Sequence, residues 1–397
     1  MDEAVTQIKR LVETSDELGR RRIMESLHKL AYSMESPEDT RDRYSFLHLQ
    51  TATVKIGFNL ELFKYMASST KAVSVDEATR KTGGQKELIG RLLRYLSSIG
   101  AIDEISAGQY LANRVTRNLA GEAAEAGICH YFGSVSMQYQ ELPSFLERSG
   151  YKEPVDETNT AFHQAWKTPL SPFIWYDSQP RLAKYFNDYM ATRSQPQQSW
   201  LKVYPVLEEA TNLHPERALY VDVGGGIGHQ CAQFKDKYPE LQGRVILQDL
   251  PFAIAEALPT PGVENMVHDV FEPQPIRGAK IYHMRSILHN HPQHKVSQIL
   301  QNIKAVMAPD SILLVDEMIL PEVGVDAVTA AVDLTMLSAF AARERTEAEW
   351  RKTFDEAGLE LVQARIYNPL TYEGVLDARL HARGTKSQVG NETAWAQ

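Results

Sequence analysis

The feature that most limits how this chain can fold is a glycine cluster at the end of an apolar segment. Residues 218–223 are apolar apart from Asp222, and they run directly into Gly224-Gly225-Gly226-Ile227-Gly228. Glycines at such a turn let the backbone pass close to a ligand that a Cβ would obstruct. The pattern predicts a strand, a tight turn and a helix over 229–238, the first unit of a layered α/β sheet.

The residues that follow continue this alternation. We expect further strands at 244–249, 263–268, 279–284, 311–316, 359–367 and 374–380, and helices at 250–257, 292–307 and 333–357. This order is typical of a doubly wound, mainly parallel sheet. We therefore expect a Rossmann-like α/β domain over 216–383, followed by a disordered tail over 384–397.

Acidic residues near the turn indicate the charge of the ligand. A dinucleotide fingerprint would end on a third glycine, but that position is His229. Asp222 would repel a phosphate and attract a ligand with a positive charge and an amino group. S-adenosylmethionine (SAM) carries both. Asp249 ends the second strand, where such folds hold ribose hydroxyls, and Asp269 follows the third strand. This order favours a SAM site over a glycine-rich turn with surface acids.

A histidine and two glutamates follow later strands. His289 comes after the fourth strand, Glu317 ends the fifth, and Glu344 lies further on. A lone histidine is more often structural than catalytic. However, a carboxylate on one imidazole nitrogen stabilises the imidazolium and leaves the other nitrogen as a base. Methyl transfer from a sulfonium to an oxygen needs such a base, together with a donor aligned behind the acceptor.

The histidines at 283, 289, 291 and 294 also raise a metal-site hypothesis. No carboxylate lies at helical spacing from them, and Pro292 would break the helix that could align them. We therefore expect no metal.

The N-terminal part contains amphipathic helices at 1–35 and 48–68, then two short helices and a hairpin over 74–111. That order indicates a winged-helix unit, which could bind DNA or serve dimerisation. Residues 75–117 contain seven basic and five acidic side chains, and the chain carries a net charge of −9, which argues against phosphate binding. We expect a dimerisation domain over 1–119.

Residues 120–215 are expected to be helical and are rich in aromatic side chains. They could form ordinary core or line a pocket for a flat, apolar ligand, and composition alone leaves both open. Cys129 and Cys231 are too few for a disulfide framework. No secretory signal or apolar run of ~20 residues is visible, so we expect a cytoplasmic protein that binds neither membrane nor nucleic acid.

The motifs between 219 and 359 follow an order found in one family. They read Asp-Val-Gly-Gly-Gly-Ile-Gly, Gln-Asp-Leu-Pro, His-Asp-Val-Phe, Leu-His-Asn-His, Asp-Glu-Met-Ile-Leu-Pro and Glu-Arg-Thr with Glu-Trp after it. This order resembles the class I SAM-dependent O-methyltransferases of the caffeic-acid type. The N-terminal half is most similar to their fungal secondary-metabolite branch.

The resemblance implies a homodimer with exchanged N-terminal helices, SAM as cofactor, and a phenol or enol hydroxyl of a polyketide-type metabolite as acceptor. It implies His289 as general base, flanked by Glu317 and Glu344. The implied cofactor residues are Asp222, Gly224, Gly226, Asp249, Leu250, Asp269, Val270 and Arg285. The implied substrate residues are His130, Met137, Trp166, Phe173, Met336 and Phe340.

One motif departs from the family, which usually reads Leu-His-Asp-Trp where this chain reads Leu288-His289-Asn290-His291. The same branch includes leporin-type pericyclases, which resemble the methyltransferases but hold SAM as a fixed positive charge. His130 resembles a substrate-polarising histidine of that group. The retained base and glutamates favour methyl transfer, and the altered motif favours cyclisation. We predict methyl transfer, with SAM-dependent cyclisation as the alternative.

Overall fold

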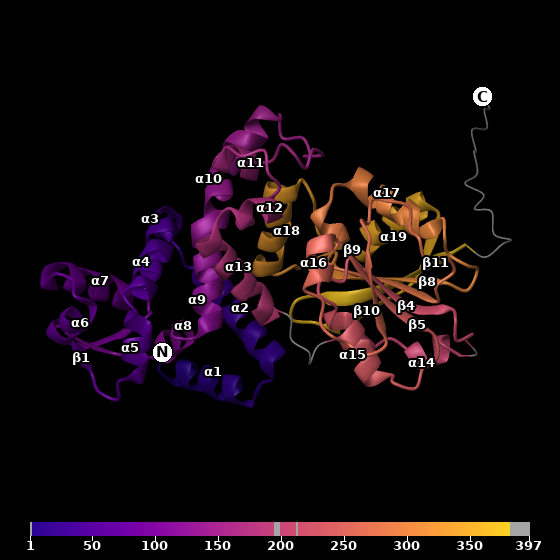
Figure 1. The fold of residues 1–397 in the computed structure, drawn as a ribbon. Helices are drawn as coiled ribbons and strands as arrows, with labels where there is room; N and C mark the ends of the chain where they lie inside the picture. The colour runs from indigo at the N-terminus through magenta and orange to yellow at the C-terminus, as the bar shows by residue number, and fades with distance from the viewer. Residues whose placement is uncertain (1, 194–198, 212, 382–397) are drawn as a thin grey trace, which may run out of the picture. The chain divides into compact units, whose positions relative to one another are not determined.

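The computed structural model describes residues 2–193, 199–211 and 213–381 (Figure 1). The chain forms two compact units. The first comprises Met1–Pro143 with Gln164–Gln195, and the second comprises Ser144–His163 with Pro196–Gln397. The region predicted to be a separate linker, 120–215, is therefore divided between the two units. The predicted disordered tail lies outside the described residues.

The first unit is mostly helical, with one small sheet. Its elements are α1 (Asp2–Thr14), α2 (Glu17–Ser33), α3 (Pro37–Ser45), α4 (Leu47–Asn59), α5 (Leu62–Ser68), β1 (Val73–Ser74), α6 (Val75–Thr82), α7 (Lys86–Ser98), β2 (Asp103–Ser106), β3 (Gln109–Leu111), α8 (Arg114–Leu119), α9 (Glu122–His130), the π-helix η1 (Tyr131–Val135), α12 (Pro172–Asp177) and α13 (Pro180–Arg193). Helices α10 (Ser136–Arg148) and α11 (Ala161–Trp166) begin in one unit and end in the other.

The helices and hairpin expected over 74–111 are present. Ser74 forms a capping box with Glu77 at the start of α6, and α7 buries Ile89, Leu93 and Leu96 on one face. The hairpin of β2 and β3 is joined by β1, a two-residue strand that the sequence pattern missed. The arrangement of elements on which the winged-helix interpretation depends is therefore present.

The second unit carries the large sheet. Its elements are η2 (Trp200–Lys202), α14 (Val206–Glu209), β4 (Ala218–Val223), α15 (His229–Lys237), β5 (Arg244–Asp249), α16 (Pro251–Ala255), β6 (Val263–Val267), β7 (Ile281–Arg285), η3 (Leu288–Asn290), α17 (Gln293–Lys304), β8 (Ile312–Leu320), α18 (Ala327–Phe340), β9 (Arg345–Thr346), α19 (Glu347–Ala357), β10 (Leu359–Asn368) and β11 (Glu373–Leu380).

The strand order confirms the predicted doubly wound sheet. It runs β10-β11-β8-β7-β4-β5-β6, and the pairs from β8 to β6 are parallel while β11 pairs antiparallel with β8 and β10. The order reverses beside β4, so the carboxyl ends of β4 and β7 flank the point where ligands bind in such sheets. The glycine cluster and the predicted base loop follow these two strands.

Helices cover both faces of this sheet (Figure 1). On one face, α17 and α19 bury Val296, Ile299, Trp350 and Phe354 against the strands. On the other face, Phe234 of α15 packs with Trp200 of η2. Because both faces are covered, the central strands are continuous apolar runs rather than alternating ones, as in Ile312–Val315.

One predicted element is wrong. The helix expected over 333–357 is two helices, α18 and α19, separated by the short strand β9. Helix α18 ends at Phe340, and its C-cap residue, Ala341, has a φ of +51°. Thr346 caps α19 in a capping box with Glu349. Nowhere in 2–193, 199–211 or 213–381 does a helix combine the length and apolar character that crossing a bilayer requires.

Candidate active site

The glycine turn after β4 is held by backbone hydrogen bonds to β5. The N–H groups of Gly224 and Gly225 both donate to the carbonyl of Gln248, at 2.8 and 3.1 Å. Gly224 and Gly226 have φ values of +71° and +61°, which residues other than glycine rarely adopt. A Cβ on Gly225 would lie 2.4 Å from Oδ2 of Asp222, whereas one on Gly226 would meet no atom within 4 Å.

Asp222 lies directly beneath this turn and is fully buried. Its Oδ1 lies 3.1 Å from Nδ1 of His283, its partner across the β4–β7 pairing. Nε2 of His283 lies 3.6 Å from Oδ2 of Asp316. Burial disfavours the imidazolium, but the two carboxylates outweigh it and raise the pKa of His283. Neither residue was predicted to support the turn: His283 was considered only as a possible metal ligand, and Asp316 was not singled out, because both stand at strand positions that look like ordinary core.

The other predicted cofactor residues follow β5 and β6. Both oxygens of Asp249 accept backbone N–H groups at 2.7 Å, one from Gly226 and one from Leu250. Burial raises the pKa of Asp249. Leu250 is exposed at the start of α16. The structure therefore brings the predicted ribose-binding acid against the glycine turn.

Asp269 and Val270 lie in the loop after β6. Asp269 is exposed and accepts the N–H of Phe271 at 2.9 Å. Val270 lies beside the turn, because a Cβ on Gly224 would be 3.8 Å from its Cγ1. The same Cβ would lie 2.6 Å from Cδ1 of Ile287. Ile287 thus also packs against the turn, and nothing in the sequence pattern distinguished this residue.

Arg285, at the end of β7, faces carboxylates of the sheet. Its Nε lies 3.6 Å from Oδ2 of Asp316, and its Nη2 lies 3.5 Å from Oε1 of Glu373. These acids raise its pKa against the opposing effect of burial. The next residue, Ser286, has a φ of +53°, so the chain turns sharply as it leaves the strand.

Glu317 anchors the loop that carries His289. Its Oε1 accepts three successive backbone N–H groups, from Ile287 at 3.0 Å, Leu288 at 2.9 Å and His289 at 3.3 Å. Three converging N–H groups form a small anion-binding nest. In the same loop, the amide of Asn290 donates to the carbonyl of Ser286 at 2.9 Å. The loop geometry is therefore fixed by a buried carboxylate and a neutral amide.

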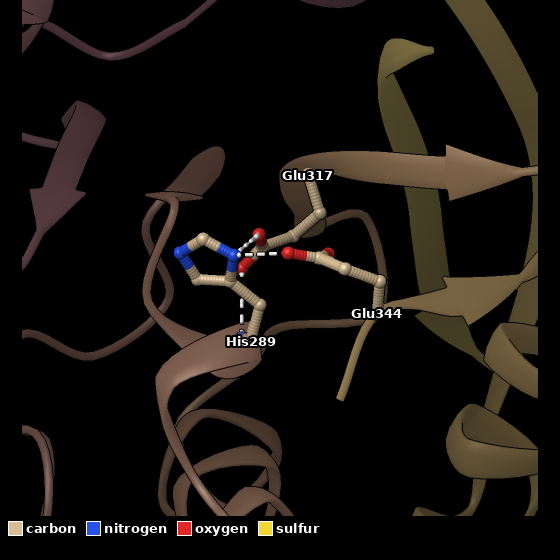
Figure 2. A group of neighbouring side chains, drawn as sticks. All are labelled: His289, Glu317 and Glu344. Atoms are coloured by element: carbon tan, nitrogen blue, oxygen red, sulfur yellow. Dashed lines mark hydrogen bonds and ion pairs between the residues drawn. The ribbon is translucent and has the colours of Figure 1, made fainter. Parts of the chain in front are cut away.

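Glu344 contacts the imidazole directly (Figure 2). Its Oε1 lies 2.8 Å from Nδ1 of His289, and Oε2 of Glu317 lies 3.8 Å from the same nitrogen. Glu344 reaches this place because the next residue, Arg345, pairs with Ile319 in the β8–β9 ladder. Figure 2 shows the imidazole turning Nδ1 toward both carboxylates and Nε2 away from them. The predicted catalytic residues are thus in contact.

Two buried carboxylates lie beside one imidazole. Burial raises the pKa of Glu317 to about 7, with Glu344 adding to the effect and His289 opposing it. The ligand atoms of all three lie within 4.8 Å of one another, a spacing that a metal ion could bridge. The hydrogen bond of Nδ1 to Glu344 uses Oε1 of that residue, while Oε2 of Glu317 and Oε2 of Glu344 are buried without a hydrogen-bond partner.

Two residues support this group and were not predicted. The N–H of Glu344 donates to Oδ1 of Asp333 at 2.8 Å. Arg345 is buried, donates to Oε1 of Gln293 at 2.9 Å and stacks on Trp350. Asp333 could have been found from its helical spacing with Met336 and Phe340, the two predicted substrate residues on α18. Met336 and Phe340 lie one helical turn apart, and α18 packs against η3.

Four predicted substrate residues lie in the first unit: His130, Met137, Trp166 and Phe173. Ser134 links two of them, because its carbonyl accepts Nε1–H of Trp166 at 3.3 Å and its Oγ lies 3.1 Å from Nδ1 of His130. Phe173 contacts Phe186, whose ring centroid lies 5.4 Å from that of His130. Met137, on α10, is 39% exposed.

The protein-family model for the O-methyltransferase domain matches residues 150–360 of this chain. The chain is 35% identical over 378 residues to O-methyltransferase ucdC of Aspergillus ustus, covering 95% of this chain and 99% of that protein. It is 36% identical to O-methyltransferase lepI of Aspergillus flavus, over 90% of this chain and 93% of that protein. It is 34% identical to demethylsterigmatocystin 6-O-methyltransferase of Aspergillus parasiticus, over 93% and 95%.

Two solved structures have a fold similar to that of this chain. The complex of LepI with SAM superposes with a TM-score of 0.84 at 34% identity, covering 96% of this chain and 98% of that chain. A structure described as a pericyclic reaction enzyme gives a TM-score of 0.83, also at 34% identity and with the same coverage.

Proposed function

The chain belongs to the O-methyltransferase family, and on this premise we propose that it methylates a phenol or enol hydroxyl of a polyketide-type metabolite, with SAM as donor and His289 as base. The observation that carries the proposal is the 2.8 Å contact between Nδ1 of His289 and Glu344. We also propose that the reaction takes place in the cytoplasm.

The glycine turn fits SAM. A Cβ on Gly226 would meet no protein atom, whereas neighbouring positions are closed by Asp222 and Ile287, so the backbone forms a cradle that a side chain would fill. We propose that Asp249 accepts the ribose hydroxyls, since each carboxylate oxygen can accept more than the one N–H it already holds. Leu250, Asp269, Val270 and Arg285 complete the proposed cofactor set.

SAM supplies an electrophilic methyl group on a sulfonium. The hydrogen bond to Glu344 places a proton on Nδ1 of His289, so Nε2 is the nitrogen that takes the proton of the acceptor hydroxyl. The imidazolium that forms is then stabilised by Glu344 and Glu317, which lie at 2.8 and 3.8 Å. Glu317 also holds the loop in place through three N–H groups.

The test is methyl transfer from labelled SAM to a panel of phenolic polyketides. We expect labelled product from the native chain and a loss of at least about 10²-fold in His289→Ala, since a general base contributes that much. His294→Ala, an exposed histidine of α17, is the matched control and should keep the native rate. Equal rates for His289→Ala and the native chain would refute the base assignment.

A second candidate is a SAM-dependent pericyclic reaction. It is favoured by the likeness to the pericyclic reaction enzyme and by Asn290-His291, where the family usually has Asp-Trp. A cyclase would form product without releasing S-adenosylhomocysteine. Measuring that by-product in the same incubation separates the two reactions, because methyl transfer releases one equivalent per product.

We propose that substrate contacts come from His130, Met137, Trp166, Phe173, Met336 and Phe340. We also propose a homodimer formed through the N-terminal helices. Helices α1, α2 and α3 contain no buried residue. On α2, the apolar side chains of Met24, Leu27 and Leu30 are each more than a third exposed. Exposed apolar side chains grouped on one helix are typical of subunit interfaces.

A further inference from the structure

The two carboxylates beside His289 have oxygen atoms that the hydrogen bonds of the site do not use. Oε1 of Glu344 pairs with Nδ1 of the imidazole, and Oε1 of Glu317 accepts the three N–H groups of the loop. Among the described residues, Oε2 of Glu317 and Oε2 of Glu344 have no hydrogen-bond partner, although each glutamate is only 2% exposed. Buried charges are usually paired or bound to a metal ion, so these oxygens indicate a cation ligand.

The positions of the three side chains suit a small divalent cation. Nδ1 of His289 lies 2.8 Å from Oε1 of Glu344 and 3.8 Å from Oε2 of Glu317. One ligand atom from each residue falls within 4.8 Å of the other two. Zn²⁺ binds nitrogen and oxygen ligands at about 2.0–2.2 Å, so neighbouring ligands of a tetrahedral ion stand about 3.3 Å apart. The two measured distances lie on either side of that value.

The fold also holds the three ligands in place. Glu317 is fixed by the loop N–H groups, and the N–H of Glu344 donates to Oδ1 of Asp333 at 2.8 Å. His289 is partly exposed, so the imidazole is the part of the group that solvent reaches. Figure 2 shows Nδ1 facing the two carboxylates, the direction from which an ion would be bound. Ligands that are already positioned lower the cost of binding.

We propose that Zn²⁺ binds Nδ1 of His289 together with one oxygen each from Glu317 and Glu344, and that the bound ion inhibits the enzyme. The coordinate bond uses the lone pair of Nδ1, so the proton of that nitrogen is lost to solvent. The neutral ring then takes one proton from solvent on Nε2, the nitrogen that must accept the proton of the substrate. The inhibition rests on the proposed function, because it takes His289 as the base, whereas the binding of the ion does not.

Calorimetric titration of the chelator-treated chain with ZnCl₂ measures binding without any turnover. We expect one tight site in the native chain. Glu344→Gln and His289→Gln each remove a ligand and should weaken that site at least tenfold. Glu347→Gln and His294→Ala, at exposed positions, are the matched controls and should bind as the native chain does. Mg²⁺ prefers six oxygen ligands and should not compete with Zn²⁺.

Circular dichroism checks that both ligand variants remain folded. Native Zn²⁺ affinity in folded Glu344→Gln and folded His289→Gln would place the ion elsewhere and overturn the proposal. X-ray absorption at the zinc edge adds a measurement on the native chain alone. It should show only nitrogen and oxygen ligands with a single imidazole, and two or more imidazoles would equally overturn the proposal.

Initial rates of methyl transfer from labelled SAM then measure the inhibition. Half-inhibition should fall at the Zn²⁺ concentration that half fills the site in calorimetry. More SAM should not relieve the inhibition, and EDTA should restore the rate. A full rate with the site filled would overturn the proposed inhibition. A chain that binds Zn²⁺ through these three residues but methylates no phenol of the panel would refute the proposed function and leave the ion site standing.

Discussion

Oε1 of Glu344 lies 2.8 Å from Nδ1 of His289, although 55 positions separate the two residues in the sequence. The contact depends on β9, a strand of two residues that pairs with the end of β8. Glu317 lies on β8 and accepts hydrogen bonds from the backbone of the loop that carries His289. Strand β8 and the residue directly before β9 therefore supply both carboxylates to one imidazole.

The first prediction concerns the charge of Glu344. Glu344→Gln keeps an oxygen that can accept from Nδ1–H but removes the charge that stabilises the imidazolium. We expect the rate of methyl transfer at saturating SAM to fall about 10²-fold, with the KM for SAM unchanged. Glu347→Gln, an exposed residue of α19, should have the native rate. A Glu344→Gln variant as fast as the native chain would mean that Glu344 only positions the ring.

The second prediction concerns stability and pH. Burial raises the pKa of Glu317 to about 7, against 4.5 for an ordinary glutamate. The folded chain therefore holds this proton more tightly than the unfolded chain. The resulting stabilisation is complete below about pH 4.5 and is lost as pH rises through 7. When the pH is raised from about 5.5 to about 8, the free energy of unfolding of the native chain should fall. In Glu317→Gln the fall should be smaller by on the order of 2 kcal/mol.

Urea unfolding at the two pH values measures this difference, because Gln can still accept the three loop N–H groups through its oxygen. Glu256→Gln, an exposed position after α16, should follow the native pH dependence. If the free energy of unfolding changed with pH by the same amount in Glu317→Gln and in the native chain, Glu317 would be ionised over the whole range, stabilised by those N–H groups.

The sheet was predictable because strands such as β4, β5 and β8 contain separate apolar runs bounded by turn residues. Strand β8 is buried on both faces, and the Ile-Leu-Leu-Val run with which it begins has no helical period. The glycine turn and the order of acids after successive strands predicted the proposed cofactor residues in the same way. These signals are local, so one sequence is enough to see them.

The surroundings of the base were not predictable in this way. The helix ending at Ala341 has no glycine, since an alanine takes the left-handed conformation there. The capping box of Thr346 and Glu349 was the one signal that a new helix begins after Glu344. The contact of Asp222 with His283 follows from the β4–β7 pairing register, which composition does not reveal.

The third prediction compares two glycines of the turn. A Cβ on Gly225 would lie 2.4 Å from Asp222 and 2.7 Å from Leu247, so Gly225→Ala should cost about 1–3 kcal/mol of stability through overpacking. Gly226→Ala meets no protein atom and should cost only about 1 kcal/mol, from its positive φ. If the cradle holds SAM, Gly226→Ala should nevertheless bind SAM at least tenfold more weakly, about 1.4 kcal/mol.

Thermal unfolding and calorimetric titration with SAM measure the two effects separately. Gly83→Ala, at the end of α6 in the other unit, is the control for a positive φ alone, since a Cβ there also meets nothing within 4 Å. It should lose a similar amount of stability and keep native SAM affinity. Native affinity in Gly226→Ala would mean that SAM does not approach this part of the turn.

The last prediction concerns the N-terminal helices. Leu27 and Leu30 of α2 are 37% and 56% exposed, and glutamates there would place charges on the face that we propose meets a second copy. We expect the native chain to sediment as a dimer and the double variant Leu27→Glu with Leu30→Glu to sediment as a monomer. Because neither side chain is buried within one chain, far-UV circular dichroism of the variant should remain native. Lys29→Glu, which reverses a charge on the same helix, should remain a dimer. A monomeric native chain, or a double variant that still dimerises, would rule out this interface.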